Sequence, residues 1–199
     1  YSITNLSNGS ESSSKDNQGL FGYMAADSAV RNIKVTGTMT GSNYVGMIVG
    51  YSAGGIIENV AVEASVTGTN NTGGIVGNSE GGIIENVAVE GSVTGTNNVG
   101  GIVGSIIEQT ANAPIRIDKC VSSANVTGTS YVGGIVGYDN CAKISNAYST
   151  GMIKSTNGCA GGLIGGIFSN NNIAYKTEIT NTYSIAKIEA NNTNYAGGL

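Results

Sequence analysis

The sequence predicts an all-β protein folded as a parallel β-helix, a solenoid of about six coils with 27–28 residues and three short strands each. The first observation is a repeat, because the segments 54–77 and 81–104 are identical except at two positions. The second is composition: Val, Ile, Thr, Asn and Ser are abundant beside 32 Gly and one Pro, which favours strands and turns over helices. The third is that apolar residues recur in fixed columns when the repeats are aligned.

The repeats align on the last glycine of a glycine–apolar–apolar–glycine signature. The spacings are 28, 27, 27, 33 and 28 residues, measured at Gly22, Gly50, Gly77, Gly104, Gly137 and Gly165. The wide spacing carries an insertion near Gln109–Pro114, and a second insertion lies near Ser169–Lys176. Loops tolerate insertions, so both stretches are expected to leave the stack of coils.

Three columns of the alignment stay apolar, which indicates three short strands per coil. Their members are Val30, Ile57, Ile84, Ile117, Ile144 and Ile179; Met39, Val66, Val93, Val126, Ile153 and Ile188; and Leu20, Ile48, Ile75, Ile102, Ile135 and Leu163. A helical solenoid would need apolar residues at i, i+3, i+4 and i+7, and a propeller blade needs about 40 residues. A shorter unit of three strands fits one β-helix coil, in which equivalent residues stack about 4.8 Å apart.

One further column holds asparagine and is interrupted only by Lys119. Its members are Asn32, Asn59, Asn86, Asn146 and Asn181. Asparagine tolerates the left-handed backbone of a turn, and its amide can bond to the next asparagine of a stack. The column is therefore predicted to be a structural ladder.

Residues 1–18 depart from the repeat, and residues 19–199 follow it. Tyr1–Leu6 is predicted to be the last strand of a preceding coil, and Ser7–Gln18 a polar loop. The closing residues Gly197–Leu199 match the start of another repeat. We therefore expect a truncated fragment of a longer protein whose export signal and anchor lie elsewhere.

The motif I-x-N-x(4)-G-x-V-x-G followed by GG[IL][VI]G is written here as IIENVAVEGSVTG with GGIVG, and as KISNAYSTGMIK with GGLIG. It resembles the GLUG repeat of bacterial surface proteins, over about residues 19–199. That family includes adhesin-like proteins and non-catalytic regions of immunoglobulin A metalloproteases. The resemblance implies a right-handed parallel β-helix displayed outside the cell, and it supplies no catalytic residue.

Several kinds of chemistry are excluded by composition. The chain has no histidine, which removes His-based triads and HExxH zinc sites, and it has neither a GxGxxG nor a Gly-Lys pair. A net charge of −4 offers no basic stripe to nucleic acid, and no apolar run approaches the roughly 18 residues of a membrane span. Cys120, Cys141 and Cys159 form no CxxC pair and no predicted disulfide framework, and Cys120 is expected to be a buried thiol.

Carboxylates recur in two columns, which matters because many parallel β-helices are polysaccharide lyases or hydrolases. Glu58, Glu85 and Asp118 share one column with Arg31 at its end, and Glu63 and Glu90 share another. Stacked acids can raise a pKa or bind calcium, whereas exposed acids can simply turn into water. Since no Lys/Arg cluster is evident nearby, the solvated interpretation is preferred, and the calcium question stays open.

Tyrosines and threonines are candidate contact residues. Tyr148 and Tyr183 share a column, as do Tyr44, Tyr131 and Tyr195, so either set is predicted to be a sugar platform or an ordinary structural stack. Two threonine files are predicted to face outward: Thr67, Thr94 and Thr127, and Thr69, Thr96 and Thr129. Such an array resembles the ice-binding face of some antifreeze proteins, but Lys154 and Glu189 interrupt the first file.

These observations favour a non-catalytic structural or binding segment of a larger secreted or surface-anchored bacterial protein, an adhesin-like stalk. The expected partners are a surface protein or glycan of a host or neighbouring cell, the rest of its own chain, and weakly its own ends. No enzyme activity, cofactor, nucleic acid or membrane insertion is expected. A carbohydrate-active enzyme or glycan-binding module is the alternative, and ice binding is a more remote one.

Overall fold

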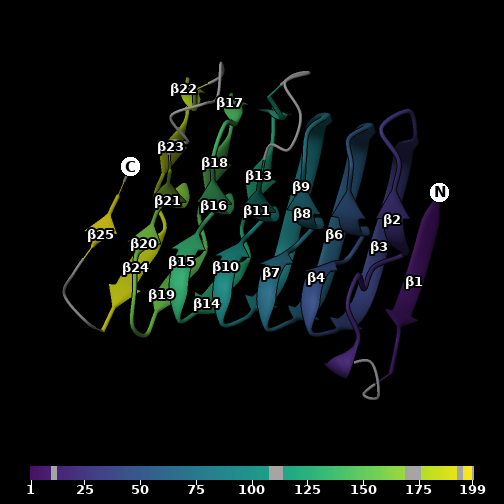
Figure 1. The fold of residues 1–199 in the computed structure, drawn as a ribbon, viewed down its shortest axis with the longest axis horizontal. Helices are drawn as coiled ribbons and strands as arrows, with labels where there is room; N and C mark the ends of the chain where they lie inside the picture. The colour runs from purple at the N-terminus through teal and green to yellow at the C-terminus, as the bar shows by residue number, and fades with distance from the viewer. Residues whose placement is uncertain (10–12, 108–113, 169–175, 192–194, 199) are drawn as a thin grey trace.

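The chain forms a stack of parallel coils (Figure 1). The computed structural model describes residues 1–9, 13–107, 114–168, 176–191 and 195–198. Neighbouring coils pair through parallel strands in three sheets, which confirms the predicted parallel β-helix. Most of both predicted insertions falls outside the described residues. Among those that are described, only residues 13 and 14 are helical, and no helix has the length and apolar character needed to cross a membrane.

Sheet A is the largest sheet and runs the length of the stack. Its strands are β1 (Ser2–Ser7), β3 (Ala29–Thr40), β6 (Ile56–Thr67), β9 (Ile83–Thr94), β12 (Arg116–Asp118), β13 (Val121–Ser122), β14 (Asn125–Gly128), β17 (Lys143–Ser145), β18 (Tyr148–Ser149), β19 (Met152–Ser155), β22 (Glu178–Thr180), β23 (Tyr183–Ser184) and β24 (Lys187–Ala190). We number the coils by their part of sheet A: coils 1, 2 and 3 contain β3, β6 and β9. Coils 4, 5 and 6 contain β12–β14, β17–β19 and β22–β24.

Sheets B and C have six strands each, in agreement with six coils. Sheet B contains β4 (Asn43–Gly46), β7 (Asn70–Gly73), β10 (Asn97–Gly100), β15 (Ser130–Gly133), β20 (Ala160–Gly161) and β25 (Ala196–Gly197). Sheet C contains β2 (Phe21–Met24), β5 (Val49–Ser52), β8 (Val76–Ser79), β11 (Val103–Ile106), β16 (Val136–Asp139) and β21 (Ile164–Ile167).

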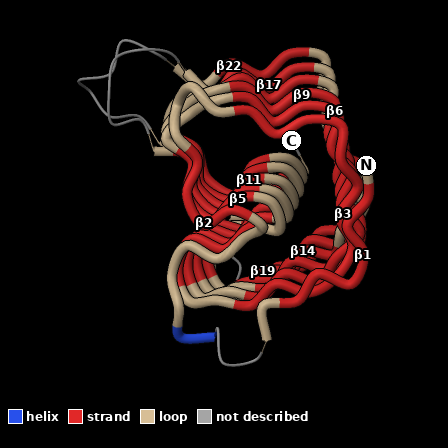
Figure 2. Tube along the Cα trace, turned by 90° about the vertical axis from the view of Figure 1, so that its right-hand side faces the viewer, coloured by secondary structure: helices blue, strands red, loops and turns tan. Residues whose placement is uncertain are grey.

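The division into strands differs from the prediction. The first two apolar columns both lie in sheet A, where coils 1 to 3 use one continuous strand of 12 residues. The third column, which includes Ile48, Ile75 and Ile102, lies in the turn between sheets B and C and not in a strand of its own. Sheet C and the turns beside it lie inside the arc of sheet A (Figure 2).

The paired glycines of the signature make this inward turn possible. A Cβ on Gly74 would meet Val89 of sheet A and the backbone of Gly101, and a Cβ on Gly101 would meet Ser122 and the backbone of Gly134. The turn therefore packs against the opposite wall with backbone alone, as only glycine permits. The isoleucine that follows each pair is fully buried.

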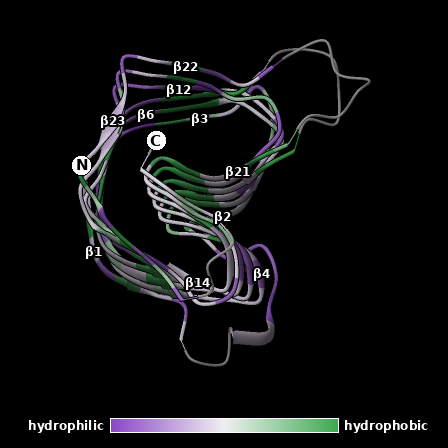
Figure 3. Ribbon diagram, turned by 90° about the vertical axis from the view of Figure 1, so that its left-hand side faces the viewer, coloured by the Kyte–Doolittle hydropathy of each residue, from purple (hydrophilic) through white to green (hydrophobic). Residues whose placement is uncertain are grey.

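The inside and outside of sheet A alternate as the pattern predicts. Val93 on β9 is 1% exposed, whereas its neighbour Thr94 is exposed. Hydrophobic residues concentrate on sheet A and on the turns within its arc (Figure 3). The last coil is less covered, because Ile179 is 41% exposed where its equivalent Ile144 is 1% exposed.

Candidate binding site

The asparagine column is a left-handed corner of sheet A that carries a hydrogen-bonded ladder. Its backbone φ angles lie between 50° and 57°, and Lys119 adopts the same conformation at 53°. Asn59 Nδ2 donates to Asn32 Oδ1 at 2.9 Å, and Asn86 Nδ2 donates to Asn59 Oδ1 at 2.7 Å. Asn181 Nδ2 donates in the same way to Asn146 Oδ1. Lys119 separates the two runs, so the ladder ends at Asn86 and starts again at Asn146.

Sequence reasoning missed a second ladder at the start of sheet B. Asn70 Nδ2 donates to Asn43 Oδ1 at 2.7 Å, and Asn97 Nδ2 donates to Asn70 Oδ1 at 2.8 Å. Asp16 closes its first end by accepting from the Asn43 side chain at 2.8 Å. The signal was present, because both copies of the sequence TNN place an asparagine at this position.

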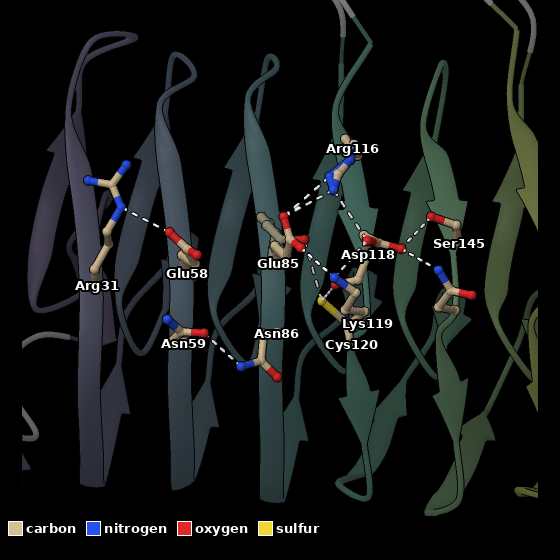
Figure 4. Close-up of polar contacts among 12 residues, drawn as sticks. Arg31, Glu58, Asn59, Glu85, Asn86, Arg116, Asp118, Lys119, Cys120 and Ser145 are labelled. Atoms are coloured by element: carbon tan, nitrogen blue, oxygen red, sulfur yellow. Dashed lines mark hydrogen bonds and ion pairs between the residues drawn. The ribbon is translucent and has the colours of Figure 1, made fainter.

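The first acid column is not a row of solvated carboxylates (Figure 4). Arg31 Nε lies 3.0 Å from Glu58 Oε2, and Glu85 lies 3.0 Å from Arg116 and 2.9 Å from Lys119. The expectation that no Lys/Arg cluster stands nearby was wrong. Arg116 pairs in register with Ile83, one coil back, and so its guanidinium reaches Glu85. The aligned columns already place Arg116 beside Ile83, but that column holds isoleucine in coils 2 and 3 and gave no sign of a cation.

Asp118 is the most enclosed acid of that column. Its Oδ1 accepts hydrogen bonds from Ser145 Oγ at 2.6 Å and Asn146 Nδ2 at 2.7 Å, while Arg116 lies 3.2 Å from Oδ2. The pKa of Asp118 is lowered, mainly by the hydrogen bond from Ser145. The hydrogen bond from Asn146 and the neighbouring cations lower it further. The group is thereby held as a carboxylate. Among the described residues, no three metal-binding side chains are grouped to hold an ion.

The tyrosine columns differ from one another. Tyr148 and Tyr183 stack with ring centroids 4.9 Å apart and planes 2° apart. Tyr44 instead packs edge-on against Tyr51 of the adjoining sheet. Tyr131 lies three coils further along the column and packs edge-on against Tyr138 and Phe168. The positions between Tyr44 and Tyr131 in this column hold Asn71 in coil 2 and Asn98 in coil 3. Tyr195 is 71% exposed. These last three rings are not brought together as a platform.

The stacked tyrosines belong to an outward column of sheet A whose side chains change size. In register it reads Lys34, Ala61, Ala88, Val121, Tyr148 and Tyr183. Over the two alanines the surface is hollowed into a depression of about 300 Å³, lined also by Asn59, Asn86, Lys119 and Val121. A smaller hollow of about 80 Å³ continues it toward Lys34, Glu63 and Glu90.

The threonine files do not form one flat surface. Thr67, Thr94 and Thr127 are in register near the ends of strands of sheet A. Thr69, Thr96 and Thr129 lie beyond a corner glycine, where Thr96 N donates to Thr69 O and Thr129 N to Thr96 O, each at 2.8 Å. In coil 4 the two threonines, Thr127 and Thr129, are half-buried. The corner between the files does not offer the flat array on which the ice-binding hypothesis depends.

The three cysteines differ in their burial. Cys120 is fully buried, as the sequence predicted, and Cys141 is 1% exposed, whereas Cys159 is partly exposed. Burial raises the pKa of the Cys120 thiol to about 12, so it stays protonated at neutral pH.

Comparison with known proteins shows similarity at the level of the fold. No protein-family model matches the chain, and no curated protein sequence matches it. Among solved structures, the chain is similar to one described as "a putative immunoglobulin A1 protease from Bacteroides ovatus", with a TM-score of 0.57 and 20% sequence identity. The alignment covers 96% of this chain and 77% of that one. The chain therefore shares the β-helical fold of that bacterial protein along almost its whole length.

Proposed function

We propose that this chain is a non-catalytic structural and binding segment of a larger secreted or surface-anchored bacterial protein, built of GLUG-type repeats. Its role is that of an adhesin-like rod that carries a contact surface on the outside of its coils. The partners we propose are a surface protein or glycan of a host or neighbouring cell. A core shared by six coils and two side-chain ladders along the stack support a stiff rod.

The observation that carries the non-catalytic assignment is the state of the acid column. A glycosidase needs one carboxyl group whose pKa is raised so that it can donate a proton. Asp118 has its pKa lowered, and Glu58 and Glu85 are each ion-paired with cations. Burial raises the pKa of Asp139, but that side chain is 0% exposed and accepts hydrogen bonds from Thr177 and from backbone amides, so it does not face a glycan. These contacts hold the carboxylates as structural partners and speak against the carbohydrate-active alternative.

The name of the Bacteroides ovatus neighbour raises proteolysis as an activity of such proteins. Within this chain the absence of histidine leaves no HExxH zinc site. We propose that, where proteins of this kind carry a protease, a repeat segment such as this one extends it from the surface and does not perform the cleavage.

An assay of the purified chain tests the non-catalytic assignment. It is incubated with immunoglobulin A and with a panel of plant, bacterial and host polysaccharides, and the products are followed by mass spectrometry. We expect no turnover. Turnover that disappears in the Glu58→Gln/Glu85→Gln double variant would overturn the proposal in favour of the enzyme. Display is tested separately by labelling intact cells of the source bacterium with antibodies raised against this chain.

A further inference from the structure

The depression over Ala61 and Ala88 has definite ends. The two alanines occupy coils 2 and 3, while the same column holds Lys34 in coil 1 and Val121 in coil 4. Beyond Val121 the column continues as the stacked rings of Tyr148 and Tyr183. The hollow is therefore a site about two coils long, roughly 10 Å at the spacing of parallel strands. Its volume of about 300 Å³ suits one or two sugar rings, not a large ligand.

One wall of the depression is the asparagine ladder. Asn59 and Asn86 are exposed, and each uses one of its two amide hydrogens for the ladder, which leaves a second donor for a ligand. Lys119 replaces the next asparagine, which leaves Asn86 Oδ1 without a ladder donor at the edge of the hollow. Amides of this kind both donate to and accept from hydroxyl groups.

The charges around the depression are mostly paired. Lys119 lies 2.9 Å from Glu85, and Lys34 lies 3.5 Å from Glu63. Glu90 lines the smaller hollow that continues the depression, and it has no ion pair among the described residues. Among the described residues that line the two hollows, both lysines are therefore ion-paired, and the Glu90 carboxylate can accept from two neighbouring hydroxyls.

The floor is apolar, which complements the walls. The methyl groups of Ala61 and Ala88 and the isopropyl group of Val121 face the hollow. A pyranose ring has a C–H face and an edge of hydroxyl groups, so its face suits this floor and its edge suits the amides and Glu90.

We propose that this depression is a binding site for a neutral mono- or disaccharide unit of a glycan. The asparagine ladder forms one wall of the site, Ala61, Ala88 and Val121 form its floor, and Glu90 lines the smaller hollow that continues it. The assignment names the ligand class of the contact surface in the proposed function, and it rests on that function.

The test is an NMR titration of the ¹⁵N-labelled chain with neutral disaccharides (chitobiose, cellobiose, lactose and mannobiose) and with the acidic sugars galacturonic acid and N-acetylneuraminic acid. We expect at least one neutral disaccharide to shift the side-chain amides of Asn59 and Asn86 and the backbone amides of Ala61 and Ala88 at millimolar concentration. The acidic sugars should leave these signals unchanged.

The matched variants are Ala88→Tyr, which fills the hollow, and Thr94→Tyr, which adds the same ring outside it on the same strand. The fold already accepts tyrosine in this column at Tyr148 and Tyr183, so Ala88→Tyr should stay folded with an unchanged circular dichroism spectrum. It should weaken binding at least about tenfold, whereas Thr94→Tyr should not weaken it.

Three results would overturn the assignment: no neutral sugar shifts these signals, the shifts persist in Ala88→Tyr, or the acidic sugars bind preferentially. The ¹H signals of the free sugar are followed in the same tube. Cleavage of the sugar would overturn the non-catalytic function, whereas absence of binding would overturn the glycan site alone.

Discussion

The side-chain amide of Asn146 donates to Asp118 Oδ1 at 2.7 Å, although the residue before Asn146 in its own column is Lys119. Asp118 thus supplies the acceptor that an asparagine would supply in the ladder. The same carboxylate accepts from Ser145 and faces Arg116, so it joins coils 4 and 5 from outside the core.

Acid should weaken this junction. The pKa of Asp118 is lowered in the folded chain from its ordinary value of 3.8, so its contribution to stability is present above that value and is lost as the pH falls below it. Chemical denaturation from neutral pH to below that value should show the loss, and Asp118→Asn should reduce the slope. Burial raises the pKa of Asp139, so ionisation of that residue destabilises the folded chain as the pH rises. The readout is therefore the difference in the free energy of unfolding between the wild type and Asp118→Asn at each pH, in which the Asp139 effect cancels. The exposed Asp27→Asn is the control, and an equal change in slope there would contradict the assignment.

Charge on the two faces of β9 should have opposite consequences. Val93→Asp places an unpaired carboxylate in the core and should destabilise by more than about 3 kcal/mol or prevent folding. Thr94→Asp faces water and should change stability by no more than about 0.5 kcal/mol. Thermal unfolding of both variants checks this, and similar losses would mean that the inward and outward residues are misassigned.

A methyl group at the inward turn should disrupt packing. Gly101→Ala would bring its Cβ against Gly134 O and Ser122 Oγ, and we expect a large fall in melting temperature. Gly198→Ala is the comparison, because no described atom other than those of its chain neighbours lies within 4 Å of its Cβ position. If Gly101→Ala were as stable as Gly198→Ala, the turn would not contact sheet A as described.

The thiols should differ in reactivity. At neutral pH an alkylating reagent should modify Cys159 in the folded chain, while Cys120 and Cys141 should react only in denaturant. Mass spectrometry of the digested protein separates the three. Rapid alkylation of Cys120 without unfolding would show that coil 4 opens readily.

The two ends of the stack should exchange faster than its middle. Ile75 and Ile102 are fully buried between complete coils, whereas the last coil exposes Ile179 and is covered on one side only among the described residues. Hydrogen exchange should be slowest near Ile75 and Ile102 and fastest beyond Ile188. The free edges of β22, β23 and β24 should also give weak, concentration-dependent association in sedimentation. Uniform protection together with a strict monomer would contradict this.

The repeat could be predicted from sequence because each coil repeats the physical constraints of the previous one. The Val93 column, the left-handed position of Asn86 and the stacking of Tyr148 on Tyr183 all follow from equivalent residues lying one strand spacing apart. A periodic chain thus reveals which of its residues are neighbours.

Other features of the fold and of the candidate site could not be predicted from the repeat, because they depend on how the chain runs within a single coil. The sequence predicts a strand at the column of Ile75, which lies in an inward turn, because alignment reports burial but not whether a buried residue lies in a strand or in a turn. The contacts of Arg116 were missed because its column holds isoleucine in coils 2 and 3, so no recurring residue marked a cation there. The hollow over Ala88 arises from small residues beside large ones, a contrast that a search for recurring residues overlooks.

The register between coils 2 and 3 also bears on how such rods change in length. Ile56 pairs with Ile83, so joining Gly54 directly to Gly82 would remove one turn and leave the following strands in register. Loss or gain of one such unit would shorten or lengthen the rod by about 4.8 Å. The reach of this segment can thus change in fixed increments, with both ends unaltered.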